Sequence, residues 1–112
     1  MKQILILDDR DIRHLHFKKK FIGKALLTHV YTAKQCIEAL NEFTFDAVYL
    51  DHDLRSEMEE SGPDTGYEVA EWLSLHPDKK PKDIYIHSLN PDGRENMKKI
   101  LPEAIEQPCF IF

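Results

Sequence analysis

The sequence predicts an α/β fold in which a parallel sheet is covered by helices on both faces. Segments with strand character alternate with segments of helical period along the 112 residues, and the connections between them are short. The clearest strand segments are apolar at every position, which is typical of strands buried on both faces of a parallel sheet. This alternation implies right-handed crossovers with a layer of helices on each side. Residues 1–112 have the usual length of one domain and are expected to form a single unit.

Five segments have strand character. The strongest are residues 3–7, 47–50 and 84–86, each a continuous apolar run that ends at a polar residue. Residues 29–31 and 109–112 are weaker candidates and are expected at the edges of the sheet. Because the sequence ends at Phe112, the fold is expected to be truncated after its fifth strand.

Capping signals and apolar spacing predict the helices between these strands. Thr32 with Gln35, and Thr65 with Glu68, have the spacing of a capping box, and apolar residues follow each at helical spacing. The Asn-Pro pair at 90–91 predicts another helix start, because proline is favoured at the first helical position. The least regular helix is predicted over residues 11–22, with an apolar stripe formed by Ile12, Leu15, Phe17, Phe21 and Ile22.

Composition and charge argue against several classes of function. The formal net charge is −5, so no broad basic surface is expected to bind duplex DNA. No apolar run approaches the ~20 residues of a membrane span, and the first residues lack the cleavage region of a signal peptide. Cys36 and Cys109 have no metal-binding spacing and fit buried thiols in a reducing compartment. We therefore expect a cytoplasmic protein without a membrane segment.

Polar residues collect directly after three of the apolar runs. These residues are Asp8 and Asp9 after the first run, Asp51, His52 and Asp53 after the run 47–50, and His87, Ser88 and Asn90 after the run 84–86. In an open parallel sheet, ligands bind outside the carboxyl ends of the strands. The sequence therefore predicts a functional site built from these side chains.

The acidic members of this set predict a divalent metal ion. Carboxylates packed within a few ångströms repel one another and raise each other's pKa values unless a cation neutralises them. The expected ligands are Asp8, Asp9, Asp51 and Asp53. Oxygen ligands favour Mg²⁺, whereas an imidazole ligand would shift the preference toward Mn²⁺ or Zn²⁺. The sequence leaves the choice among these metals open.

Several of these residues also have a structural interpretation. Asp9 and Asn90 stand where helix N-caps are expected, and either histidine could bond a backbone carbonyl. Ser88 could be a structural hydroxyl rather than a ligand of a phosphate oxygen. Arg94, one turn into the following helix, could be solvated rather than reaching an anion. The pairing of Asp8 with Asp51, each after a buried strand, favours the site interpretation.

Four motifs in order resemble the cyclic-phosphate-processing receiver domain family: LDDR at 7–10, LDHDL at 50–54, TGY at 65–67 and IHSLNPDGR at 86–94. The resemblance implies a flavodoxin-like, receiver-like three-layer sandwich with a five-stranded parallel sheet of order 2-1-3-4-5. It also implies that Asp8 and Asp9 bind the metal and that Asp51 stands where ordinary receivers accept a phosphoryl group. Ordinary receivers carry a lysine and a helix after the fifth strand. No lysine follows Lys99 here, so phosphorelay is disfavoured.

The leading functional prediction, which the resemblance implies, is a metal-dependent phosphoesterase that processes a cyclic phosphate. The substrate would be a cyclic nucleotide or a 2′,3′-cyclic phosphate end of RNA. Asp51 would hold the metal, and His52 or His87 would move a proton as general acid or base. Ser88, Asn90 and Arg94 are the predicted substrate contacts.

Two other functions are compatible with the same residues. One is a non-catalytic receiver-like module that binds a nucleotide or a phosphoryl group and signals through a partner. The other is an interaction module with a vestigial site. The vestigial interpretation predicts erosion of the acids and histidines, and these are all present. The oligomeric state is left open.

Overall fold

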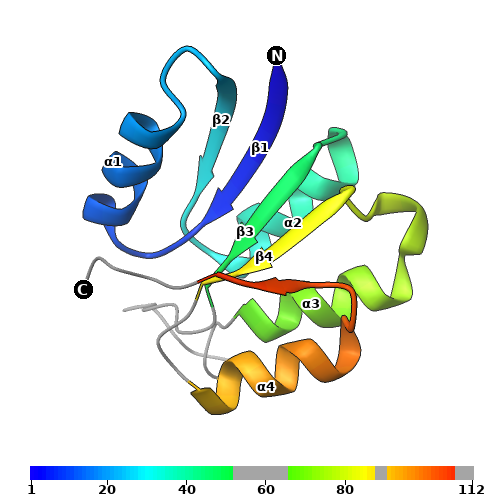
Figure 1. Ribbon diagram of the computed structural model, residues 1–112. Helices are drawn as coiled ribbons and strands as arrows, with labels where there is room; N and C mark the ends of the chain where they lie inside the picture. Colours follow the sequence, from blue (N-terminus) through cyan, green and yellow to red (C-terminus); the bar gives the residue numbers. More distant parts are fainter. Residues whose placement is uncertain (52–65, 88–90, 108–112) are drawn as a thin grey trace.

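The computed structural model describes residues 1–51, 66–87 and 91–107. Five parallel strands form one sheet of order β2-β1-β3-β4-β5, which confirms the predicted topology (Figure 1). The elements are β1 (Lys2–Leu7), α1 (Asp11–Lys20), β2 (Ala25–Val30), α2 (Ala33–Glu42), β3 (Ala47–Leu50), α3 (Gly66–Leu75), a 3₁₀ turn (Pro77–Lys79), β4 (Asp83–Ile86), α4 (Pro91–Ile100) and β5 (Ile105–Glu106). Within these described ranges, none of the helices has the length and apolar character needed to span a membrane.

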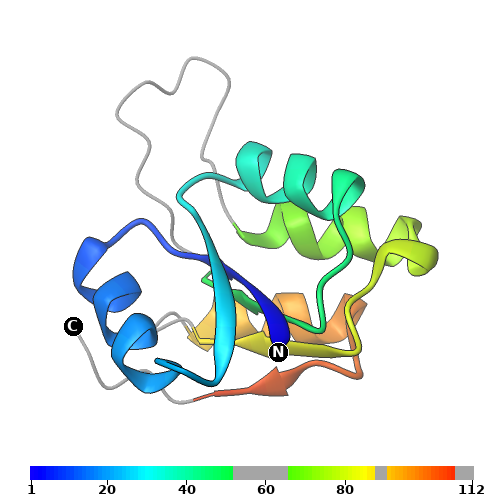
Figure 2. The same cartoon turned by 90° about the horizontal axis from the view of Figure 1, so that it is seen from above.

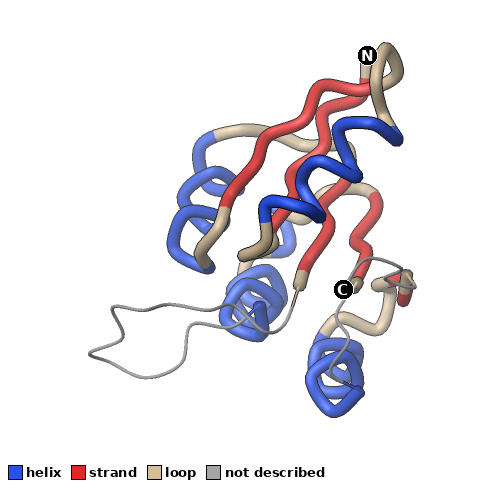
Figure 3. Tube along the Cα trace, turned by 90° about the vertical axis from the view of Figure 1, so that its left-hand side faces the viewer, coloured by secondary structure: helices blue, strands red, loops and turns tan. Residues whose placement is uncertain are grey.

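Alternate residues of the strands point to opposite faces of the sheet and build two separate apolar clusters. On the face that we call the three-helix face, residues such as Leu5 and Leu50 pack against α2, α3 and α4. On the α1 face, Ile4, Ile6 and Tyr49 pack against Phe17 of α1. Figures 2 and 3 show α1 on one side of the sheet and α2 and α3 on the other. Both layers of helices predicted from the sequence are therefore present.

The start of α2 forms as its capping box predicts. The N–H of Gln35 donates to Thr32 Oγ1 at 3.1 Å, and Gln35 Oε1 accepts the N–H of Tyr31 at 2.9 Å. These bonds satisfy donors that have no partner within the helix. Cys36, one turn further on, is fully buried, and burial raises the pKa of its thiol. Cys36 is therefore the buried thiol that the sequence predicts, whereas Cys109 lies outside the described residues.

The predicted apolar stripe of α1 is confirmed at Phe17 and Phe21 and is wrong at its other members. Ile12 and Leu15 are 54% and 49% exposed. The buried residues of this helix are Arg13, His14 and Phe17. Polar contacts cause this difference. Arg13 and His14 both bond to Asp8 at the end of β1, and these bonds fix the rotation of the helix about its axis.

Several element boundaries also differ from the sequence prediction; β2, for example, covers Ala25–Val30 rather than residues 29–31. α1 ends at Lys20, two residues early, and Ile22 is exposed. Gly23 then adopts a positive φ of 71°, a conformation that glycine takes without steric cost and that turns the chain toward β2. The fifth strand that the structure describes is Ile105–Glu106, and residues 109–112, where the sequence prediction placed it, lie outside the described residues. Both residues of β5 are exposed, so neither length nor apolar pattern marks this strand in the sequence.

Candidate functional site

Three polar residues, Asp8, Asp51 and His87, directly follow the last residues of β1, β3 and β4. Their side chains keep the alternation of faces that the strands have. The N–H of Asp51 donates to the last carbonyl of β1 at 3.1 Å, and the N–H of His87 donates to the last carbonyl of β3 at 3.0 Å. Because successive side chains point to opposite faces, Asp8, Asp51 and His87 all fall on the α1 face. All three are buried. The pleat of the sheet therefore brings together three residues that are far apart in the sequence.

Arg13 of α1 lies between two of these carboxylates. Its Nη1 atom is 3.2 Å from Asp8 Oδ2 and 3.2 Å from Asp51 Oδ2, and the residue is only 5% exposed. A guanidinium is almost never buried unless it is paired with an opposite charge. Its two carboxylate partners therefore explain why Arg13, and not Ile12 or Leu15, faces the sheet.

His87 and Asp8 form a buried hydrogen-bonded pair. His87 Nε2 lies 2.8 Å from Asp8 Oδ2. Because an ionised carboxylate only accepts, Nε2 carries the proton and Nδ1 of the neutral ring keeps its lone pair. That Nδ1 atom is buried and has no hydrogen-bond partner among the described residues. The pair thus has the form of an imidazole oriented by a carboxylate, with a free basic nitrogen at the other side of the ring.

The surroundings shift the pKa values of both groups below their ordinary ranges. Burial raises the pKa of Asp8, but the bond and charge of His87, the backbone N–H of Arg10 and the guanidinium of Arg13 together outweigh it. Burial lowers the pKa of His87 and outweighs the opposite effect of Asp8. Asp8 is therefore ionised and His87 neutral at neutral pH.

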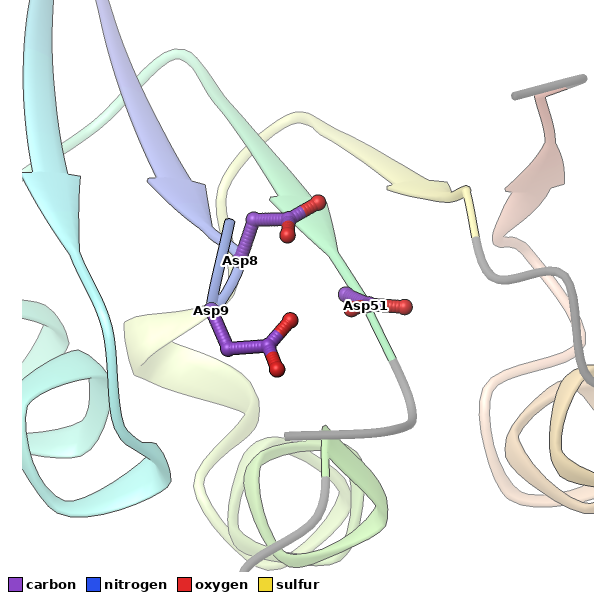
Figure 4. Close-up of side chains that lie close together, drawn as sticks. All are labelled: Asp8, Asp9 and Asp51. Atoms are coloured by element: carbon purple, nitrogen blue, oxygen red, sulfur yellow. The ribbon is translucent and has the colours of Figure 1, made fainter. Parts of the chain in front are cut away.

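Asp9 completes an acidic cluster with Asp8 and Asp51, and the three side chains lie close together at the ends of β1 and β3 (Figure 4). One carboxylate oxygen from each lies within 4.8 Å of the others. Ligand oxygens around an octahedral Mg²⁺ stand about 3 to 4 Å apart. When ionised, three carboxylates and the Arg13 guanidinium leave two negative charges, which one divalent cation would balance. The residues present therefore fit a divalent metal ion.

A second polar contact fixes the other side of β1. His14 Nε2 lies 2.9 Å from the backbone oxygen of Asp8, which only accepts, so Nε2 donates. The Nδ1 atoms of His14 and His29 are 2.6 Å apart, so one of these rings donates to the other. Burial, with help from His14 and Lys18, lowers the pKa of His29. The contact between His29 of β2 and His14, and the bond from His14 to the backbone oxygen of Asp8, hold the end of β1 in place.

The described residues bring together Asp8, Asp9, Asp51 and His87, which the sequence assigned to the site. The predicted site residues His52, Asp53, Ser88 and Asn90 lie outside the described residues. Arg94 lies near the start of α4 and is half-buried, and its contact with an anion stays a prediction.

Sequence analysis missed Arg13 and His14. A signal was present, because both lie three or four residues before Phe17 and therefore share a helix face with it and with Phe21. An apolar stripe drawn through the two phenylalanines would have included these two polar residues. Such a position is better explained by a buried partner than by a solvated surface.

The fold is shared with solved receiver domains. The response regulator protein TrrA from Thermotoga maritima, solved in complex with Mg²⁺ and BeF, is 19% identical with a TM-score of 0.74, over 100% of this chain and 90% of that chain. The signal receiver domain of a histidine kinase from Syntrophus aciditrophicus is 21% identical with a TM-score of 0.73, covering 97% and 80%. That of PA1611 from Pseudomonas aeruginosa PAO1, with magnesium coordinated in its active-site cleft, is 16% identical with a TM-score of 0.73, covering 99% and 87%. At these identities the likeness establishes the receiver fold alone.

The sequence itself carries the family assignment. No curated protein matches the chain. Residues 3–103 match the family described as the cyclic-phosphate processing receiver domain. The match includes every residue of the acidic cluster as well as Arg13 and His87. The chain therefore belongs to the family of cyclic-phosphate processing receiver domains.

Proposed function

We propose that this domain is a metal-dependent phosphoesterase that opens a cyclic phosphate. The observation that carries the proposal is that a candidate metal site and a candidate proton carrier share one residue, Asp8. The acidic cluster of Asp8, Asp9 and Asp51 fits a divalent cation, and Asp8 also orients the buried imidazole of His87. Metal binding and proton transfer would thus be linked through a single carboxylate.

The reaction needs few groups. A divalent cation in the acidic cluster would polarise a phosphoryl oxygen and favour attack by water. Water attacks phosphorus, one ring P–O ester bond breaks, and the departing oxygen takes up a proton. Asp8, Asp9 and Asp51 orient the reactants, and His87 Nδ1 accepts a proton in the attack or returns one to the leaving oxygen.

Asp8 has a further role in this scheme. It accepts the Nε2–H of His87 at 2.8 Å, so it fixes the tautomer of the ring and stabilises the imidazolium that proton transfer creates. His52 is the second candidate for proton transfer, and Ser88, Asn90 and Arg94 are the proposed contacts of the substrate. The proposed substrates are a cyclic nucleotide or a 2′,3′-cyclic phosphate end of RNA.

Incubation with a panel of candidate substrates tests the proposal. The full chain is mixed with cyclic mononucleotides, cyclic oligonucleotides and RNA ending in a 2′,3′-cyclic phosphate, with and without Mg²⁺ or Mn²⁺. Mass spectrometry should show that one class gains the mass of one water, only when metal is present. Asp51→Asn should abolish the gain, and Glu38→Gln, which makes the same charge change on the exposed face of α2, should not. If no class gains water with either metal, the phosphoesterase proposal fails.

One observation favours a second candidate, a receiver-like module that binds a nucleotide or phosphoryl group without turnover. Asp8 and Asp51 are already paired with Arg13, so a protein group supplies part of the counter-charge at the site. Calorimetry with the same panel separates the two candidates, because a module without turnover would show saturable binding while the ligand keeps its mass.

A further inference from the structure

Arg13 and a divalent cation would share two carboxylates, those of Asp8 and Asp51. The guanidinium of Arg13 touches Asp8 Oδ2 and Asp51 Oδ2, each at 3.2 Å. The same two carboxylates supply two of the three ligands of the acidic cluster. A cation bound at 2.0–2.1 Å to either oxygen that Arg13 contacts would lie within about 5.3 Å of Arg13 Nη1, because the two distances add to no more than that.

Two positive charges at that separation repel each other strongly in a buried site. Screening by salt and water is weak there, since the Asp8 and Arg13 side chains are 0% and 6% exposed. Arg13 cannot relieve the repulsion at low cost, because it is only 5% exposed and lies on the buried face of α1. Its bonds to the two carboxylates are the contacts that have to weaken when a cation binds.

We propose that Arg13 is an internal counter-cation that competes with the metal for Asp8 and Asp51. Without metal, it bridges the two carboxylates and prevents their repulsion, so the ends of β1 and β3 stay together. With metal, the bridge to Asp51 opens and the cation takes over the neutralisation. The inference rests on the metal-dependent site of the proposed function and adds the way in which metal occupancy of that site is set.

Competition and preorganisation by Arg13 predict opposite changes in metal affinity when Arg13 is removed. Removal of Arg13 changes the charge of the site from −2 to −3, counting three ionised carboxylates with and without one guanidinium. The more negative site should bind a divalent cation more tightly, while the metal-free protein should become less stable. If Arg13 instead preorganised the ligands for the metal, its removal would weaken metal binding.

Calorimetric titration with Mn²⁺ tests the sign directly. We expect Arg13→Gln to bind Mn²⁺ at least about tenfold more tightly than the unchanged protein, a difference of about 1.4 kcal/mol. Without metal, its unfolding temperature should be lower than that of the unchanged protein. Addition of Mn²⁺ should raise the unfolding temperature of the variant by more than it raises that of the unchanged protein. Lys34→Gln, which removes a positive charge from the exposed surface of α2, is the matched control and should bind like the unchanged protein.

The outcomes separate the two proposals. Equal or weaker Mn²⁺ binding by Arg13→Gln overturns the competition alone. No binding by either protein overturns both the competition and the metal-dependent function. Should Arg13→Gln fail to fold, the Arg13 Nε–H signal in ¹⁵N-resolved NMR of the unchanged protein still decides. It should shift and exchange faster with solvent as Mg²⁺ saturates the site, and an unchanged signal at saturation overturns the competition.

Discussion

The two faces of the sheet differ in how their helices are held. On the three-helix face, aliphatic residues of the strands meet fully buried apolar residues such as Val69 and Leu73 of α3. On the α1 face, the apolar cluster around Phe17 gives way, at the ends of the strands, to Arg13, Asp8 and their polar partners. Apolar burial places α2, α3 and α4, whereas ion pairs and hydrogen bonds set the rotation of α1. The chemistry of the site lies on the face where the apolar pattern alone does not predict the structure.

This contrast makes the acidic cluster the most sensitive point of the α1 face. Asp51→Asn should remove detectable binding of divalent cations and turnover together, because two remaining carboxylates opposite Arg13 carry too little charge to hold the ion. Calorimetry with Mn²⁺ and the substrate assay measure both losses. Glu38→Gln serves as the control. Retention of tight metal binding by Asp51→Asn would show that Asp51 is not a ligand.

His87 tests the division between metal ligands and proton carriers. His87→Ala should lower the rate of turnover by on the order of 10²–10⁴, with a smaller effect on metal affinity, since the variant loses a proton carrier but keeps all three carboxylates. Steady-state kinetics and Mn²⁺ titration on the same samples make the comparison. Full turnover by His87→Ala would move proton transfer to His52, whereas loss of metal binding together with turnover would make His87 a positioning or ligating residue.

The contrast between faces also has a consequence for stability. Leu73→Ala on the three-helix face should lower the free energy of unfolding by about 2–5 kcal/mol, because Leu73 is fully buried and the change leaves a cavity. Leu15→Ala on α1 is the matched change and should cost no more than about 0.5 kcal/mol, since Leu15 is 49% exposed. Urea unfolding measures both. A comparable loss from Leu15→Ala would mean that α1 buries the apolar stripe first predicted from the sequence.

The smallest expected effect is a pH dependence from the pair of His14 and His29. The pKa of His29 in the folded protein is below the ordinary value of 6.5, so its contribution to stability is present above pH 6.5 and is lost as the pH falls below it. His29→Asn should therefore reduce the loss of unfolding free energy between pH 7 and pH 5. His16→Gln, at an exposed position of α1, should leave that loss unchanged. An identical pH profile for His29→Asn would mean that His29 is not held neutral by the fold.

The elements that could be predicted from the sequence are those determined by residues close together in the sequence. The apolar strands and the box of Thr32 and Gln35 are local signals, and each formed as expected. The cluster of Asp8, Asp9 and Asp51 could also be predicted, because the carboxyl ends of parallel strands share one edge of the sheet.

The features that the sequence did not predict depend on contacts between residues far apart in the sequence. The rotation of α1 is set by the bond from Arg13 to Asp51, 38 residues away, and no periodicity within residues 11–22 contains that information. The two-residue strand β5 exists because β4 offers it a partner, since its own residues are exposed. Long-range polar pairing thus limits how much of this fold a pattern of apolar residues can predict.

The central claim is that one divalent cation binds at the acidic cluster on the α1 side of β1 and β3. Paramagnetic broadening of the ¹H–¹⁵N NMR signals by substoichiometric Mn²⁺ tests it most directly, because the broadening falls off steeply with distance from the ion. The account predicts that the amide signals of Asp8, Asp9 and Asp51 broaden first and that Asp51→Asn removes the effect. Broadening that begins elsewhere on the acidic surface, or that survives Asp51→Asn unchanged, would contradict it.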